Sequence, residues 1–202
     1  MQKNVEHILK VLNEMFPNAN IELHHKNHFE LLIAVVLSAQ ATDVSVNKVT
    51  PQLFEMFPTP HDLAQAEVTV VEQIIKTIGL YQLSKQLVEL YDAEIPQKRE
   101  QLEALPGVGR KTANVVLSNA FGIPALAVDT HVMRVSIRLG LAKKGDTALA
   151  IESKLNRKIP RELWSKVHHQ FIFFGRYHCL AKNPKCQICP LYDVCRYENK
   201  EK

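Results

Sequence analysis

Residues 105–121 read LPGVGRKTANVVLSNAF, in which a proline and two glycines precede an apolar pattern with helical spacing. Pro106 breaks the segment before it, and the two glycines allow the tight turn that follows. From Gly109 onward, apolar residues recur at intervals of three and four positions, which places them on one face of a helix. The stretch therefore predicts two helices joined by a hairpin over about residues 97–121.

Helical spacing recurs along nearly the whole chain, and no alternating strand pattern, repeat or low-complexity tract interrupts it. Residues 31–37 are uniformly apolar, so a buried helix and a buried strand both fit them by pattern alone. Pro96 is placed to open one helix and Gly79 to close another. We predict an all-α fold, with helices over about residues 5–16, 29–38, 43–49, 68–77, 83–91, 96–104, 109–120, 130–139, 148–158 and 162–174.

The composition is that of a soluble globular protein, with 46% of the 202 residues hydrophobic and 23% charged. No apolar run approaches the roughly 20 residues of a membrane span, and the N-terminus lacks the apolar core of a signal peptide. Residues 1–96 carry a net charge of −6 and residues 97–202 a net charge of +10. The basic half is typical of a protein with an anionic partner, although a solvated basic surface fits the charge equally well.

The glycines of the hairpin leave backbone N–H groups uncovered beside the N-terminus of the following helix, which is a favourable place for an anion. A phosphate of nucleic acid would fit there, with Arg110 adding positive charge. A plain helical corner capped by glycine is the alternative interpretation. The order Pro-Gly-Val-Gly-Arg-Lys in the basic half favours phosphate binding by Gly107, Gly109 and Arg110.

Lys111 falls in the first turn of the second hairpin helix, where the helix dipole disfavours the protonated ammonium. An amine in that position can act as a nucleophile toward carbon, although most lysines are solvated surface residues. Asp129 precedes another helical pattern and is a typical helix N-cap. A carboxylate held there would be able to face Lys111 across a cleft and stabilise a cationic sugar or accept a proton. His131 is a candidate phosphate contact or a packing residue.

All four cysteines lie within seventeen residues, at Cys179, Cys186, Cys189 and Cys195. A secreted disulfide scaffold spreads its cysteines to close large loops, so this grouping indicates a metal or cluster site instead. Four thiolates hold either a tetrahedral zinc ion or an iron–sulfur cube. The single short hook and the wider outer spacings suit the larger cluster, but spacing alone does not decide between the metals.

Three blocks of sequence resemble the endonuclease III family. Members of this family are bacterial base-excision-repair DNA glycosylases of the helix–hairpin–helix superfamily. The blocks are residues 31–48 (LLIAVVLSAQATDVSVNK), residues 105–135 (LPGVGRKTANVVLSNAFGIPALAVDTHVMRV), and residues 174–179 (FGRYHC) with the four-cysteine loop. The resemblance covers nearly the whole chain.

The resemblance implies two helical lobes with a DNA-binding cleft between them. One lobe is a six-helix barrel over residues 21–123 that contains the hairpin. The other combines residues 1–20 with residues 124–202 and carries a 4Fe–4S cluster on its cysteine loop, residues 179–195.

The resemblance also implies a function and roles for single residues. The function is excision of oxidised pyrimidines from DNA through a lysine Schiff base, followed by cleavage of the strand 3′ to the abasic site by β-elimination. Lys111 matches the nucleophile of the family and Asp129 its carboxylate partner. The matched cluster ligands are Cys179, Cys186, Cys189 and Cys195, and the residues expected at DNA are Gln40, Leu80, Gly107, Gly109, Arg110 and His131.

The expected partner is double-stranded DNA that contains damaged pyrimidines or abasic sites. The resemblance to a bacterial repair enzyme implies a monomer that acts in the cytoplasm at the nucleoid, without contact to a membrane.

One segment departs from the family that the chain resembles. Fourteen residues separate Tyr81 from Pro96, about eight fewer than in the family, which is roughly two helical turns. This shortening directly follows Leu80 and puts its role in question. Two alternatives stay open: a mismatch adenine glycosylase, which Lys111 and the short chain argue against, and a non-catalytic DNA-binding protein with a zinc-stabilised tail.

Overall fold

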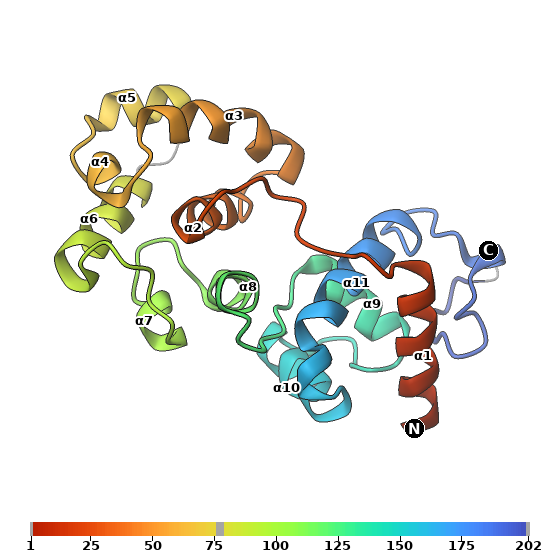
Figure 1. Cartoon of the computed structure of the whole chain (residues 1–202). Helices are drawn as coiled ribbons and strands as arrows, with labels where there is room; N and C mark the ends of the chain where they lie inside the picture. The colour runs from red at the N-terminus through yellow and green to blue at the C-terminus, as the bar shows by residue number, and fades with distance from the viewer. Residues whose placement is uncertain (1, 76–78, 201–202) are drawn as a thin grey trace. The chain divides into compact units, whose positions relative to one another are not determined.

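The computed structural model describes residues 2–75 and 79–200, and over these residues the chain is helical, with no strand (Figure 1). The all-α fold class predicted from the sequence is confirmed. None of the helices in the described ranges is long and apolar enough to cross a membrane. In chain order the helices are α1 (Gln2–Met15), α2 (His28–Leu37), α3 (Asp43–Met56), α4 (Pro60–Ala64), α5 (Val68–Ile74), α6 (Gly79–Tyr91), α7 (Arg99–Glu103), α8 (Arg110–Phe121), α9 (Thr130–Arg138), α10 (Ala148–Lys158), the 3₁₀ helix η1 (Arg161–Leu163), α11 (Trp164–Tyr177) and the 3₁₀ helix η2 (Cys186–Ile188).

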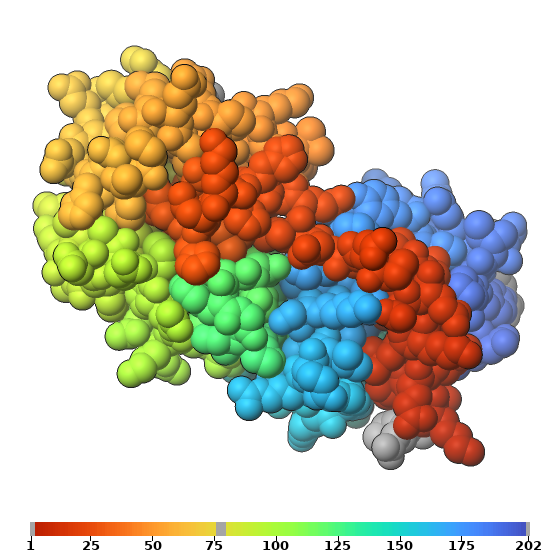
Figure 2. All heavy atoms as spheres, viewed as in Figure 1, coloured from red at the N-terminus to blue at the C-terminus, as the bar shows by residue number. Residues whose placement is uncertain are grey.

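The chain folds into two compact units. We call Glu22–Ile123 the inserted unit, because it interrupts the second unit in sequence. We call Met1–Ile21 together with Pro124–Lys202 the terminal unit. Within the terminal unit α1 packs against α11, and Figure 2 shows the red N-terminal segment lying against the blue C-terminal one.

The uniformly apolar segment of the inserted unit forms a helix, α2, rather than a strand. Asn27 caps this helix, since its side chain accepts a hydrogen bond of 2.9 Å from the backbone N–H of Glu30. The Glu30 carboxylate in turn accepts a hydrogen bond of 2.6 Å from the backbone N–H of Lys26. α8 and α3 pack against α2, and nearly every residue of α2 is buried. A helix that is buried all round has no polar face, which explains why its pattern was ambiguous.

The core of the terminal unit forms where α1, α9 and α11 meet. Leu12, Val132, Val135, Phe171 and Phe174 are among its almost completely buried members. Burying a large apolar side chain contributes about 1.5–3 kcal/mol, so this core fixes the two helices that matter for the sites below. α9 begins directly after Asp129, and α11 ends just before the first cysteine.

The helix expected over residues 43–49 is longer than its pattern indicated, because it continues through Pro51 to Met56. Val46, Thr50 and Leu53 form one buried stripe on this helix. Their packing outweighs the loss of one backbone hydrogen bond at the proline.

The helix expected to open at Pro96 begins at Arg99 instead, so this prediction was wrong. Ile95 and Pro96 are both buried, and they anchor an extended segment ahead of α7 rather than its first turn. A proline is compatible with either place, and tertiary packing decided between them.

Gly79 was expected to end a helix, but it lies in α6, which is described from this residue onward. α6 starts earlier than predicted because Leu80, Leu83 and Leu87 form a continuous apolar stripe, and each has a relative exposure of 0%. The described part of α5 ends at Ile74. The end predicted for that helix, Thr77, lies outside the described residues.

Candidate functional site

The hairpin joins α7 to α8 and is held by buried apolar residues and a side-chain hydrogen bond. Leu105 and Val108 are buried, and Arg99 Nε donates to Asn114 Oδ1 at 2.9 Å, which ties the two helices together. Gly107 has φ +77°, a conformation that L side chains rarely adopt. Gly109 is the exposed N-cap of α8 and, as a glycine, supplies no side-chain cap. The hairpin therefore presents backbone N–H groups at a helix N-terminus, as an anion site requires.

Arg110 begins α8 on the exposed side of the hairpin. Its Nη1 lies 3.8 Å from Glu103 Oε1, and both side chains are partly exposed. An exposed ion pair of this length contributes little to stability. Glu103 thus holds the guanidinium loosely beside the hairpin N–H groups, where a phosphate would be able to replace the carboxylate.

Lys111 lies in the first turn of α8 and is half-buried. Its Nζ donates a long hydrogen bond of 3.5 Å to Ser38 Oγ, and Ser38 Oγ donates to the backbone carbonyl of Val35 at 2.9 Å. Ser38 is the C-cap of α2, so the lysine amine is positioned where the end of α2 meets the start of α8. Sequence reasoning missed Ser38, although it lies in one of the blocks that carried the resemblance.

Asp129 caps α9 as predicted, since its Oδ1 accepts a hydrogen bond of 2.7 Å from the backbone N–H of Val132. The cap fixes the position of the carboxylate at a helix N-terminus, which stabilises negative charge. Asp129 belongs to the terminal unit and Lys111 to the inserted unit, so each is described within its own unit.

His131, in the first turn of α9, is held by a neighbouring arginine. Burial lowers the pKa of its imidazole and nearby cations oppose protonation as well, although Asp129 acts in the opposite direction. Its Nδ1 lies 3.2 Å from Arg134 Nη2, which also donates to the Gly175 carbonyl at 2.6 Å. A hydrogen bond with the Gly175 backbone acts in the same direction as Asp129 and raises the pKa of the ring. A Cβ at Gly175 would lie 3.0 Å from His131 Cβ, so glycine makes room for this arrangement.

The two residues expected to enter the duplex have opposite surroundings. Gln40 is exposed in the turn after α2, as insertion requires. Leu80 is completely buried in the first turn of α6. We correct its assignment from a DNA contact to a core residue. The physical reason is that Leu80 lies on the same buried face of α6 as Leu83 and Leu87.

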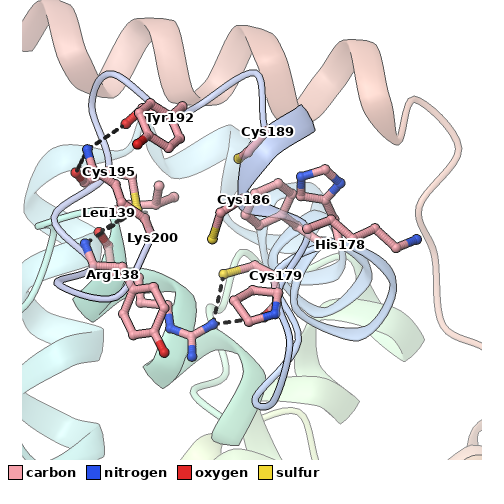
Figure 3. A pocket seen from close by; sticks show the side chains of 13 residues that line it. Arg138, Leu139, His178, Cys179, Cys186, Cys189, Tyr192, Cys195 and Lys200 are labelled. Atoms are coloured by element: carbon pink, nitrogen blue, oxygen red, sulfur yellow. Dashed lines mark hydrogen bonds between the residues drawn. The ribbon is translucent and has the colours of Figure 1, made fainter. Parts of the chain in front are cut away.

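The four cysteines surround one hollow in the terminal unit, and Figure 3 shows the sulfurs of Cys179, Cys186 and Cys189 directed toward its centre. None of the four forms a disulfide. Over the described ranges, no three His, Cys, Asp or Glu side chains are arranged to hold a single metal ion. Burial raises the pKa of the Cys186 thiol, and it raises that of Cys189 to about 11. A bound cationic cluster would reverse this effect, because thiolates are the ligating form.

Arg138, at the end of α9, holds both ends of the cysteine loop. Its guanidinium donates to Cys179 Sγ at 3.3 Å, to the Leu180 carbonyl at 2.7 Å and to the Ala181 carbonyl at 3.2 Å. Its own backbone carbonyl accepts from the N–H of Arg196 at 2.7 Å. The guanidinium carbon also lies 4.0 Å from the centroid of the Tyr197 ring. Sequence reasoning missed this residue, although its place four residues after Arg134 puts both arginines on one face of α9.

Comparison with known proteins identifies the class of the chain. A model of the HhH-GPD superfamily of base excision DNA repair proteins matches residues 33–161. A model of the iron–sulfur binding domain of endonuclease III matches residues 179–195. The fold, the hairpin and the four-cysteine site thus define a base excision DNA repair protein with an iron–sulfur domain.

Individual relatives narrow this class. The chain is 52% identical to endonuclease III of Bacillus subtilis, over 96% of this chain and 92% of the relative. It is 47% identical to endonuclease III of Escherichia coli K12, over 96% and 95% of the two chains. A solved trapped covalent intermediate of endonuclease III with DNA superposes with a TM-score of 0.94 at 50% identity, covering 97% of this chain and 96% of that one. The chain belongs to the endonuclease III family.

Membership confirms three predictions from the sequence. The function and enzyme class are those of a bifunctional DNA glycosylase and AP lyase of base excision repair. The four cysteines belong to an iron–sulfur domain and hold a 4Fe–4S cluster, so the zinc interpretation was wrong. The Bacillus subtilis alignment is 202 residues long but takes in 96% of this chain, so the relative has positions that this chain lacks.

Proposed function

We propose that this chain removes oxidised pyrimidines from double-stranded DNA and then cleaves the strand at the abasic site, with Lys111 as the nucleophile. The observation that carries the proposal is the position of Lys111. Lys111 is the second residue of α8, two positions after Gly109 of the hairpin, and its Nζ donates to Ser38 Oγ at the end of α2. A relative solved as a trapped covalent intermediate with DNA supports a covalent mechanism.

In the proposed reaction the neutral Lys111 amine attacks C1′ of the damaged nucleotide while the bond from C1′ to the base breaks. The base leaves with the bonding electron pair and takes up a proton. Loss of the amine proton and opening of the sugar ring give a Schiff base between Nζ and C1′. Removal of a proton from C2′ then expels the 3′ phosphate by β-elimination, and water releases the lysine.

Asp129 has an electrostatic role in this scheme. Positive charge develops on the sugar as the base departs, and a carboxylate fixed by the α9 cap stabilises that charge without having to reorganise. The same carboxylate is a candidate acceptor for the C2′ proton.

DNA binding in this proposal rests on the hairpin and on two polar side chains. The N–H groups at Gly107 and Gly109 bind a backbone phosphate, and Arg110 exchanges Glu103 for that phosphate. The His131 imidazole contacts the DNA backbone, and Gln40 fills the gap that the flipped nucleotide leaves. The proposed enzyme acts as a monomer on chromosomal DNA in the bacterial cytoplasm.

The cluster supplies a rigid cross-link among the four cysteines when it is bound, and no reaction step passes through it. Cys179, Cys186, Cys189 and Cys195 hold it, and Arg138 binds the chain on either side of it. The loop is thereby kept in one conformation against α9.

Borohydride trapping on duplexes that contain thymine glycol or an abasic site tests the proposal. Borohydride reduces a Schiff base to a stable amine, so the wild-type protein should become covalently linked to the DNA. Lys111→Ala should give no adduct and no nicking, while Lys85→Ala, an exposed lysine of α6 paired with Glu89, should match the wild type. Normal trapping by Lys111→Ala would show that another amine is the nucleophile. A cluster-loaded wild type that binds these duplexes but neither traps nor nicks them would instead support the non-catalytic alternative.

A further inference from the structure

A second hollow in the terminal unit has a strongly basic lining, which does not include the cysteine ligands themselves. Its volume is about 380 Å³, and it is formed by the first turns of α1, the segment after α9, α10, and the two residues that flank Cys195. Four cationic side chains line it, together with several apolar ones, and no acidic residue is among its lining. The cations are Lys143, Lys154, Lys158 and Arg196.

Specific contacts hold three of these cations in place, while the Lys143 side chain is exposed at the rim. Lys158 Nζ donates to the Leu141 carbonyl at 2.6 Å, and Lys154 Nζ lies 2.5 Å from Asp146 Oδ2. The Arg196 side chain lies against Gly140, where a Cβ would come within 2.6 Å of Arg196 Cδ. Gly140 also has φ +70°, which L side chains rarely adopt. Both this conformation and the lack of room for a Cβ favour glycine at this position.

Like charges crowd this hollow, and one carboxylate beside it offsets part of the charge. Burial lowers the pKa of the Lys158 ammonium, and the nearby cations Lys154, Arg157 and Arg196 lower it further. Asp146 opposes this effect and already pairs with Lys154. A bound anion would relieve the repulsion, because opposite charge within a few ångströms favours the protonated lysine.

The lining is also partly apolar, which favours an anion that carries an apolar group as well as its charge. Val5, Ile8, Leu139 and Leu141 are buried core residues that form its floor, and the partly exposed Val194 adds an apolar edge. A simple inorganic anion uses charge alone, whereas a phosphorylated small molecule with a planar ring uses both the cations and the apolar wall.

We propose that this hollow, where four cations converge beside an apolar wall, binds a small molecule that carries phosphate groups and is about the size of a nucleoside diphosphate. Lys143, Lys158 and Arg196 contact the phosphates, and the apolar wall receives the ring. The site is separate from the residues assigned to the reaction, so it does not depend on the identity of the nucleophile.

Calorimetric titration of the cluster-loaded protein at low salt tests this site, with ADP, pyrophosphate and adenosine as probes. ADP should bind in the micromolar to submillimolar range, pyrophosphate more weakly, and adenosine not measurably. Lys143→Gln should weaken ADP binding about tenfold, because it removes one charge-assisted contact. Lys144→Gln, which alters an exposed neighbour outside the lining, should change it less than about twofold. Lys158→Met should weaken binding at least as much as Lys143→Gln.

Lys143→Gln keeps the hydrogen bond of Lys158 to Leu141, so it tests the site even if Lys158→Met fails to fold. Absence of ADP binding up to about 10 mM, a Kd near the weak limit of specific recognition, would overturn the proposal. An equal loss of affinity in Lys143→Gln and Lys144→Gln would overturn it as well.

A competition experiment tests whether the hollow binds a free phosphorylated molecule or the DNA backbone. ADP should leave duplex affinity unchanged, and Lys143→Gln should bind duplex as tightly as Lys144→Gln does. If duplex DNA displaces ADP and Lys143→Gln weakens duplex binding by the same factor as ADP binding, the hollow belongs to the DNA-binding surface and the proposal is wrong.

Discussion

The hairpin of the inserted unit and the cysteine loop of the terminal unit are both short irregular segments, but they are stabilised in different ways. The hairpin is anchored by its own buried side chains, Leu105 and Val108, and by helices on both sides. The cysteine loop, residues 179–195, has one buried side chain, Leu191, among its residues. A loop with so little apolar burial needs other stabilisation, which here comes from Arg138 and the cluster. We infer that the hairpin keeps its fold without a cofactor, whereas the loop depends on its cluster.

The largest expected effect is that of removing a cluster ligand. Cys186→Ser should abolish the visible absorbance of the cluster and lower the melting temperature by about 10 °C, since about 4 kcal/mol of stabilisation is lost from a domain of this size. Hydrogen exchange should accelerate across residues 179–195 but not in α8. Equal acceleration in the hairpin would show that the two regions are not independent.

A smaller effect is expected from Arg138→Gln, which removes the guanidinium contacts to Cys179, Leu180 and Ala181. Hydrogen bonds from a charged group contribute about 1.5–3 kcal/mol, and the neutral amide replaces only part of them. We expect a destabilisation of about 2–3 kcal/mol, measured by denaturant unfolding, and faster loss of iron on exposure to air. Arg157→Gln on the exposed side of α10 is the matched control, and similar losses in both variants would contradict the role given to Arg138.

The terminal unit is also expected to be sensitive to acid. Burial lowers the pKa of His169 from 6.5 to about 3, so the folded protein keeps it neutral while the unfolded chain binds a proton below pH 6.5. The contribution of neutral His169 to the free energy of unfolding is fully present above pH 6.5. It declines as the pH falls from 6.5 toward 3. At pH 5.5 the loss from this group is about 1 kcal/mol. Unfolding of His169→Gln should therefore depend less on pH between 6.5 and 5 than unfolding of the wild type. An unchanged slope would mean that other groups set the acid sensitivity.

The sequence predicted the parts of this molecule that local chemistry determines. The glycines of the hairpin, the Asp129 cap and the spacing of the cysteines are readable because each depends on residues close together in the chain. Ser38 and Arg138 were missed because their roles arise from contacts between distant segments, over 73 residues for Ser38 with Lys111 and 41 for Arg138 with Cys179. Leu80 was misassigned for a different reason: the helix was predicted to begin at residue 83, so the face that Leu80 shares with Leu83 and Leu87 was not recognised.

The smallest expected effect on stability is that of a substitution in the hairpin. Arg110→Gln removes a weak ion pair with Glu103, so stability should change by less than about 0.5 kcal/mol. If Arg110 exchanges that carboxylate for a phosphate, the variant should bind duplex DNA more weakly and the slope of log K against log salt should fall by about 1. Lys10→Gln, an exposed residue of α1 paired with Glu14, should leave the slope unchanged. A reduced slope without loss of stability would place Arg110 at the DNA backbone and show that the buried residues of the hairpin, rather than Arg110, stabilise its fold. An unchanged slope would restrict phosphate binding at the hairpin to the glycine N–H groups.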